Sequence, residues 1–163
     1  MTTQQQRPEG EPKGVEVLRG RWAGTGSGHF PTIDDFEYSE EIVFAPTPKP
    51  FLTYTSRTRG LPDGRPLHME SGYLRPVAGG DVELLVTQPT GFVEIHRGMI
   101  EADGTLSLTL LTLAASPDAK PVLDVRRVLR VHNDTLTYDV WMAHDQTPLT
   151  HHLHAELQRV TEE

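Results

Sequence analysis

The sequence of 163 residues contains no cysteine. Disulfide bonds, thiolate zinc sites, iron–sulfur clusters and cysteine nucleophiles are therefore excluded, and thiol redox chemistry with them. Long apolar runs are missing too, since no stretch approaches the roughly 20 residues that a membrane-spanning helix needs. The N-terminal segment has no apolar run after its basic residue, so we expect no signal peptide and a cytoplasmic location.

Basic residues are few compared with acidic ones. Lysine and arginine total 15 against 23 aspartates and glutamates, which gives a formal net charge of -8. The longest basic cluster, Arg126-Arg127 with Arg130, is too short for a nucleic-acid footprint. Because nucleic acids and anionic membranes attract proteins through basic patches, we expect neither as a partner.

The length suits one domain with a real core. Residues 1–14 are rich in Gln, Pro, Gly and Glu and contain no aliphatic residue after Met1. Such a segment buries too little apolar area to offset the entropy cost of ordering it. We therefore expect a disordered polar tail at 1–14 and a single domain at 15–163.

Apolar and polar residues alternate through most of this domain, as in Val82, Leu84 and Val86 with Asp81 and Glu83 between them. Alternation of this kind is typical of strands with one buried face. Turn-forming pairs such as Asp-Gly, Gly-Gly and Asn-Asp separate the runs. The runs predict strands at 19–28, 36–45, 50–58, 66–76, 81–88, 91–99, 104–114, 119–131, 134–144 and 148–159. No window of twelve residues has a clear 3.6-residue period, and we expect at most one short helical turn, near Pro31 to Asp35.

Many antiparallel strands joined by hairpins must close or stack to hide their edges. The predicted fold class is therefore all-β, a ten-stranded antiparallel up-and-down barrel with little helix. About eight strands leave room for side chains or one small ligand, and ten should leave more. The fold thus predicts a cavity for an apolar or planar ligand without identifying that ligand.

Three of the eight histidines, His151, His152 and His154, lie in the last predicted strand. Neutral imidazole is a good ligand for iron, zinc and copper. On a regular strand His152 and His154 share one face with Glu156, and His151 takes the other, so periodicity does not separate His152 from His154. The alternative interpretation is a polar, solvated strand end.

The first predicted strand reads Gly-Arg-Trp-Ala-Gly-Thr-Gly-Ser-Gly over residues 20–28. Glycine at alternate positions leaves one face bare, which marks a bend or a close approach by a ligand or another backbone. We expect Trp22 to plug one end of the barrel. A bend that closes the barrel without any ligand explains the glycines equally well.

The Gly-x-Trp opening is similar to that of lipocalins and fatty-acid-binding proteins. The longer pattern Gly-x-Trp-x-Gly-x-Gly resembles the signature of the nitrobindins, which are small haem-binding β-barrels. The resemblance continues through segments 29–33, 36–41, 49–54, 67–75, 89–98 and 148–157, so it spans about residues 15 to 160. In the last segment it rests on His152-Leu153-x-Ala155-x-Leu157.

The resemblance implies a ferric haem b near the mouth of the barrel, with His152 as the proximal iron ligand and the catalytic residue. It also implies nitric oxide binding and conversion of peroxynitrite to nitrate, a step that requires no general base. We expect the distal side of the haem to consist of small or apolar groups of the glycine strand. The expected cofactor contacts are Gly20, Trp22, Gly24, Gly26, Thr32, Lys120 and His152.

His68 and His96 are expected to be hydrogen-bonded structural residues. Glu40 and Glu41 point to opposite faces of their strand, so they do not form a paired-carboxylate site. Two other functions stay open, a non-enzymatic carrier of a hydrophobic small molecule and a sensor of haem or nitric oxide. The partners are small-molecule ligands in each case, and the protein is expected to be a monomer or a homodimer.

Overall fold

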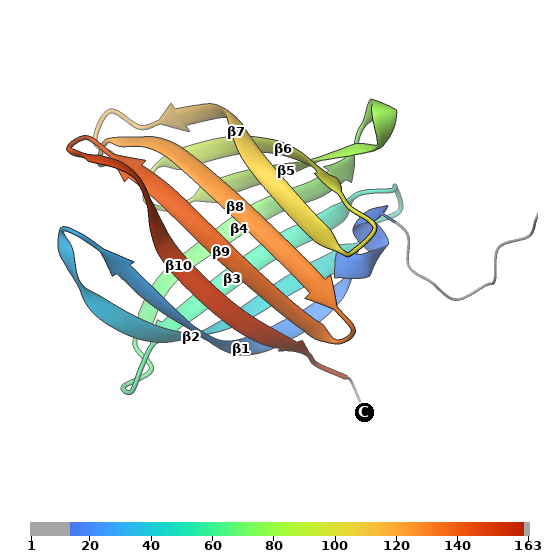
Figure 1. Ribbon diagram of the computed structural model, residues 1–163, viewed down its shortest axis with the longest axis horizontal. Helices are drawn as coiled ribbons and strands as arrows, with labels where there is room; N and C mark the ends of the chain where they lie inside the picture. Colours follow the sequence, from blue (N-terminus) through green and yellow to red (C-terminus); the bar gives the residue numbers. More distant parts are fainter. Residues whose placement is uncertain (1–13, 162–163) are drawn as a thin grey trace, which may run out of the picture.

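The alternating segments form a closed barrel of ten antiparallel strands in the computed structural model, which describes residues 14–161 (Figure 1). The strands are β1 (Gly20–Phe30), β2 (Ile33–Pro46), β3 (Leu52–Gly60), β4 (Pro66–Pro76), β5 (Asp81–Gln88), β6 (Phe92–Ile100), β7 (Thr105–Ala115), β8 (Val122–His132), β9 (Thr135–His144) and β10 (Thr147–Arg159). Each strand pairs with its neighbours in sequence, and β10 closes the barrel on β1. The predicted fold class is confirmed.

The expected helical turn near Pro31 to Asp35 is wrong. Pro31 and Thr32 form a tight turn, and Ile33 already begins β2, where it pairs with Phe30 of β1. The hairpin register leaves only these two residues for the connection, so the chain has no room for a helical turn.

Short 3-10 helices occur elsewhere, as η1 (Gly14–Leu18) and η2 (Ala78–Gly80). The helix η1 is held against the barrel because Val15 and Leu18 bury their side chains there. It begins at Gly14, so the expected tail at 1–14 is one residue too long. Residues 1–13 of that tail lie outside the described part of the chain. Neither described helix is long and apolar enough to cross a membrane.

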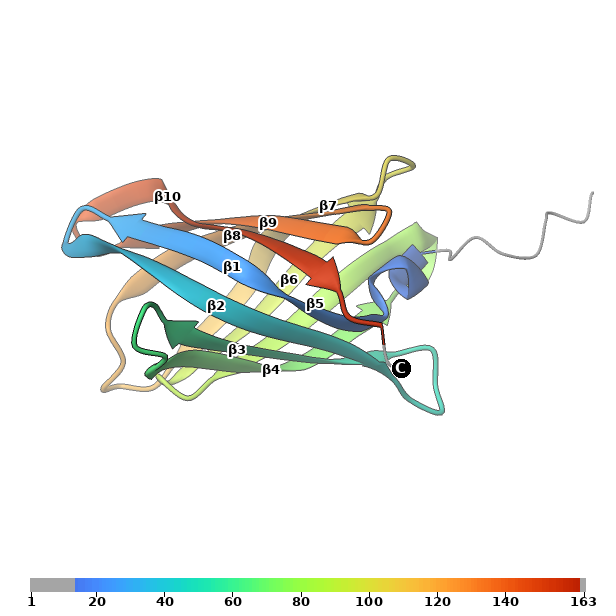
Figure 2. The ribbon, with the colours of Figure 1, turned by 90° about the horizontal axis from the view of Figure 1, so that it is seen from below.

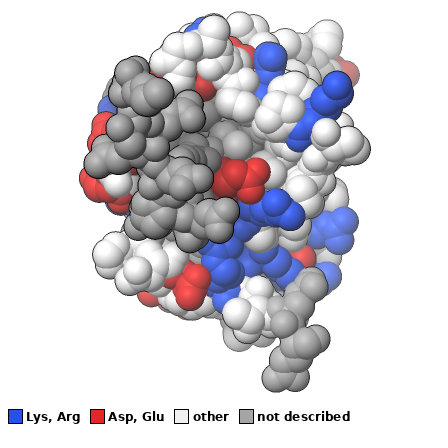
Figure 3. Space-filling view, turned by 90° about the vertical axis from the view of Figure 1, so that its right-hand side faces the viewer, with Lys and Arg blue, Asp and Glu red and all other residues white. Residues whose placement is uncertain are grey.

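The short helix η1 lies at one end of the barrel (Figure 2). Large apolar side chains fill the barrel beneath it. Trp22 is fully buried there, and its Nε1 donates to the carbonyl oxygen of Leu18 at 2.9 Å. The Arg159 guanidinium lies over the indole, 4.1 Å from the ring centroid. Lysine and arginine side chains gather on the outside of this end (Figure 3). Trp22 thus plugs the barrel, as the sequence predicts.

The glycines of β1 make room for other parts of this chain. A Cβ atom on Gly24 would meet the carbonyl oxygen of Glu156 and lie 2.8 Å from the Cα of Leu157, both on β10. A Cβ atom on Gly26 would lie 2.5 Å from the Cζ of Tyr38, whose ring covers the bare face. The close approach is therefore made by the neighbouring backbone and by an aromatic ring of β2.

The other end of the barrel, where the 31–32 turn and the 116–121 loop lie, is its open mouth. The ladder between β7 and β8 is short, running only from Thr105↔Arg130 to Leu108↔Arg127. Beyond Leu108 the mouth-side halves of β7 and β8 are not paired with each other. The barrel wall is therefore weakest next to the 116–121 loop.

We expect Gly24→Ala to lower the free energy of unfolding by about 1–3 kcal/mol, because the added methyl group collides with the β10 backbone. Gly60→Ala is the matched control, since its Cβ would find only the flexible Arg65 side chain at 3.4 Å. Denaturant unfolding of both variants measures the difference. Equal stabilities would show that β1 and β10 are not in close backbone contact.

Candidate functional site

The mouth half of the barrel encloses a cavity of about 910 Å³. This volume lies near the upper end of the roughly 300–1,000 Å³ typical of small-molecule sites. Much of the wall is apolar and comes from strands all around the barrel, including Ile42, Leu84, Val125, Leu129, Val140 and Leu153. The cavity is therefore suited to a large ligand with an apolar body.

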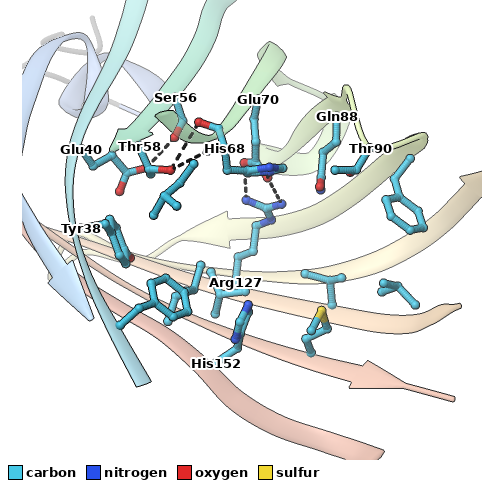
Figure 4. Close-up of a pocket in the computed structure, with 18 of the residues that line it drawn as sticks. Tyr38, Glu40, Ser56, Thr58, His68, Glu70, Gln88, Thr90, Arg127 and His152 are labelled. Carbon is cyan, nitrogen blue, oxygen red and sulfur yellow. Dashed lines mark hydrogen bonds and ion pairs between the residues drawn. The ribbon is translucent and has the colours of Figure 1, made fainter. Parts of the chain in front are cut away.

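A buried arginine crosses the lumen in the deep part of the cavity. Arg127 on β8 donates from Nη1 and Nη2 to the two carboxylate oxygens of Glu70 on β4, at 2.8 and 3.0 Å (Figure 4). Its Nη2 also donates to Glu94 on β6 at 2.8 Å. Burial alone would raise the pKa of both carboxyls, but the Arg127 guanidinium holds the pKa of Glu70 and that of Glu94 below their usual values. These three side chains form a charged floor, which we call the Arg127 floor.

A second polar group lines the wall beside this floor. Glu40 on β2 accepts hydrogen bonds from the Ser56 hydroxyl at 2.5 Å and from the Tyr138 hydroxyl. The hydroxyls of Tyr138 and Tyr38 lie 2.6 Å apart. Burial raises the pKa of Glu40 to about 7, although both of its donors oppose the shift. Burial therefore makes the Glu40 carboxylate a stronger base than an exposed glutamate.

His152 reaches the cavity through an irregularity in β10. The pairing of β10 with β9 shifts by one residue between His151↔Trp141 and Leu153↔Val140, so His152 is the extra residue of a β-bulge. Bulges re-aim side chains, and both His152 and Leu153 line the cavity here. The Nδ1–H of His152 donates to the carbonyl oxygen of His29 at 2.9 Å. Burial lowers the pKa of His152, although this hydrogen bond opposes the shift.

The other two histidines of β10 face outward. The Oδ1 atom of Asp139 accepts from His151 Nε2 at 2.8 Å and from His154 Nδ1 at 2.9 Å. The expectation that His152 and His154 share a face is therefore wrong, because the bulge inverts the alternation. Glu156 is exposed on the outside for the same reason. Among residues 14–161 no group of three or more His, Asp or Glu side chains is arranged to hold a metal ion.

Residues 12–159 match the family model described as the THAP4-like, heme-binding beta-barrel domain. The chain belongs to this family. The resemblance to nitrobindins is thereby confirmed. The description of the family itself names a haem-binding β-barrel.

Relatives and solved structures agree with the family assignment. The chain is 60% identical to "Peroxynitrite isomerase 1" of Rhodococcus jostii over 148 residues, which are 91% of this chain and 84% of that protein. It is 46% identical to "Peroxynitrite isomerase 2" of Mycobacterium marinum, over 87% of this chain and 90% of the relative. The crystal structure of Rv2717c from M. tuberculosis superposes with a TM-score of 0.84 at 42% identity, covering 90% of this chain and 95% of that one.

The structure brings together only part of the predicted family site. Lys120 lines the cavity near its mouth, as does His152. Thr32 is exposed in the 31–32 turn beside Ile33, which lines the mouth, and Thr32 itself is not among the lining residues. As a haem contact it stays a prediction.

The glycine-rich strand β1 does not line the cavity at the positions where haem contacts were expected. The cavity-lining residues do not include Gly20, Trp22, Gly24 or Gly26. Trp22 packs at the closed end under η1, and Tyr38 covers Gly26. In this family member the wall that we expected the glycines to form is instead made by side chains of β2.

Sequence reasoning missed the Arg127 floor and its neighbour Glu40. A signal was present, because these glutamates occupy the inward phase of their strands. Glu40 lies two positions from Tyr38 and from Ile42, so it shares the inward face of β2 with these buried residues. Glu94 shares the inward face of β6 with Phe92 and His96 in the same way. An acidic residue at a core position indicates a buried polar partner.

The two strand histidines differ from each other. His96 is fully buried, and its Nε2 lies 3.4 Å from Glu94 Oε2. His68 lines the cavity, and its Nε2 lies 3.5 Å from Glu70 Oε2. Both histidines therefore flank the Arg127 floor, His96 in the packed interior of the barrel and His68 at the cavity.

We expect Arg127→Ala to lower the free energy of unfolding by about 3–5 kcal/mol, because it leaves the buried Glu70 and Glu94 without their cation. Arg130→Ala on the same strand is the control. Its ion pair with Asp139 is half exposed, so the expected loss is about 0–1 kcal/mol. Urea unfolding of the two variants gives the comparison, and similar losses would contradict a structural role for the floor.

Proposed function

We propose that the protein binds ferric haem b through His152, binds nitric oxide at the same iron and isomerises peroxynitrite to nitrate. The observation that carries this proposal is the His152 imidazole, which the β10 bulge directs into the cavity. The names of the two relatives, both called peroxynitrite isomerase, support the choice of reaction.

The hydrogen bonding of His152 suits an iron ligand. A carbonyl oxygen only accepts, so the bond to His29 places the imidazole proton on Nδ1 and leaves the Nε2 lone pair available. Metal-binding histidines commonly donate their second nitrogen in this way, which orients the ring and raises its basicity. The lowered pKa of His152 keeps the ring neutral, as metal binding requires.

The remaining cavity residues fit a porphyrin. Its macrocycle needs an apolar enclosure, which the aliphatic wall supplies. Its propionates need cations near solvent, and the lining includes Lys120 and Arg65 at the mouth. Lys120 and Arg65 would be the residues that pair with the propionates of a bound haem.

A bound ferric haem would supply a Lewis acid, which is the chemistry that weakens the O–O bond of peroxynitrite. His152 would hold the iron, and the apolar wall would enclose the reacting anion. Isomerisation to nitrate leaves the charge and the proton count unchanged, so no residue has to act as a general base. The open mouth lets nitrate leave.

We expect added hemin to produce a Soret band that the His152→Ala variant loses, because that variant lacks the imidazole proposed to hold the iron. His154→Ala is the matched control, since this histidine bonds Asp139 on the outer surface and should keep the band. Absorption titration measures both. No band in the unchanged protein would favour the carrier of a hydrophobic small molecule.

We expect the haem-loaded protein to raise the yield of nitrate from peroxynitrite above that of free hemin at equal concentration. The His152→Ala variant mixed with hemin should fall to the level of free hemin, because its iron lacks the axial imidazole. Stopped-flow decay of peroxynitrite together with nitrate analysis measures the effect. A bound haem that adds nothing to the nitrate yield would favour a sensor.

A further inference from the structure

Two phenols meet inside the cavity and take no part in the function proposed above. Tyr38 and Tyr138 both line the cavity, with their hydroxyl oxygens 2.6 Å apart. They are 1% and 7% exposed, whereas Tyr73 on the outer surface is 51% exposed. A reagent formed in bulk water therefore meets Tyr73 first, and a reagent formed inside the barrel meets the phenols of the cavity wall, which are this pair and Tyr54. The Tyr54 hydroxyl donates to Glu70, whose carboxylate is already engaged by Arg127, so only the pair has a carboxylate without a cation beside it.

The pair carries its own proton acceptor. The Tyr138 hydroxyl donates to Glu40, whose other carboxylate oxygen accepts from Ser56. Because Tyr138 has a single hydroxyl proton, the Tyr38 hydroxyl must donate to Tyr138 while Glu40 is ionised. The order of donation is therefore Tyr38 to Tyr138 to Glu40.

This arrangement favours one-electron oxidation of a phenol. Removing an electron from a phenol makes its hydroxyl a strong acid, so oxidation is much easier when a base takes the proton in the same step. Burial raises the pKa of Tyr138 and that of Tyr38, so neither phenol is ionised at neutral pH and the proton has to move with the electron. The Glu40 carboxylate is in hydrogen-bond contact with the proton that must move.

Aromatic contacts join the pair to the proposed iron ligand. The ring centroids of His152 and Phe36 are 6.4 Å apart, and those of Phe36 and Tyr38 are 6.0 Å apart. Only one ring therefore separates the imidazole from the first phenol. A radical released near His152 reaches these phenols without leaving the cavity.

We propose that Tyr38 and Tyr138 form a radical trap for nitrogen dioxide, the one-electron oxidant released when the O–O bond of peroxynitrite breaks homolytically and recombination fails. The inference rests on the proposed function, which supplies peroxynitrite to this cavity. Tyr138 gives an electron to nitrogen dioxide, which becomes nitrite, and its hydroxyl proton passes to Glu40. A second nitrogen dioxide joins the phenoxyl radical at the ring carbon next to the oxygen. The hydrogen on that carbon leaves as a proton, and the product is 3-nitrotyrosine.

The trap is tested by mapping nitro groups. Haem-loaded protein receives small repeated additions of peroxynitrite, and peptide mass spectrometry locates 3-nitrotyrosine. We expect most nitro groups on Tyr38 and Tyr138. In a parallel sample, a separate peroxidase makes nitrogen dioxide in bulk solution from nitrite and hydrogen peroxide, and we expect Tyr73 to be nitrated first.

Glu40→Gln tests the proton acceptor, with Glu41→Gln as the matched control, since Glu41 faces outward and pairs with Arg21. We expect nitration of the pair to fall by about tenfold or more in Glu40→Gln, as for the loss of a positioned base, and to be unchanged in Glu41→Gln. Nitro groups mainly on Tyr73 of the haem-loaded protein, or equal nitration in both variants, would overturn the trap.

The same samples separate this inference from the proposed function. The Soret band and the nitrate yield report haem binding and isomerisation. If both are normal and the pair is not nitrated, the trap alone fails. If the band or the yield is missing in the unchanged protein, the proposed function fails, and the trap fails with it because its oxidant is not formed in the cavity.

Discussion

The Arg127 guanidinium is held across the lumen between Glu70 and Glu94, near the level at which the cavity gives way to the packed core. Removing three charges from water is costly, and the forked geometry of arginine offsets that cost with paired hydrogen bonds. On one side Trp22, Phe44 and other large side chains fill the barrel. On the other side the strands enclose the cavity, so the floor separates the part that provides stability from the part that holds a ligand.

The strands were predictable because their alternation continues almost without interruption. The residues at the bottom of the cavity were harder to predict, since Arg127 and Glu70 are 57 positions apart in sequence. Inward-phase glutamates can be read from single strands, but their partner is defined only when the barrel closes and β8 faces β4. The same limit applies to Tyr38 and Tyr138, which meet at a separation of 100 positions.

His152 shows the opposite case. A period of two predicts the same face for His152 and His154. The choice of His152 as the proposed iron ligand therefore rests on the family pattern Leu153-x-Ala155-x-Leu157. In the structure the bulge inserts His152 before that frame and turns it inward, while His154 bonds Asp139 outside. A one-residue bulge shifts the phase of the alternation, but the polar residues around His152 do not reveal where the shift falls. The proposed ligand could therefore not be chosen from alternation alone.

The ladder between β7 and β8 is short, so one part of the barrel wall has few hydrogen bonds between its strands. Hydrogen-bonded pairing stops there at Leu108 and Arg127, and Arg127 is also the residue that anchors the floor. Strands with few shared hydrogen bonds separate at the lowest free energy. Local opening of the wall therefore costs least beside the mouth, on the cavity side of Arg127, and costs most in the packed half.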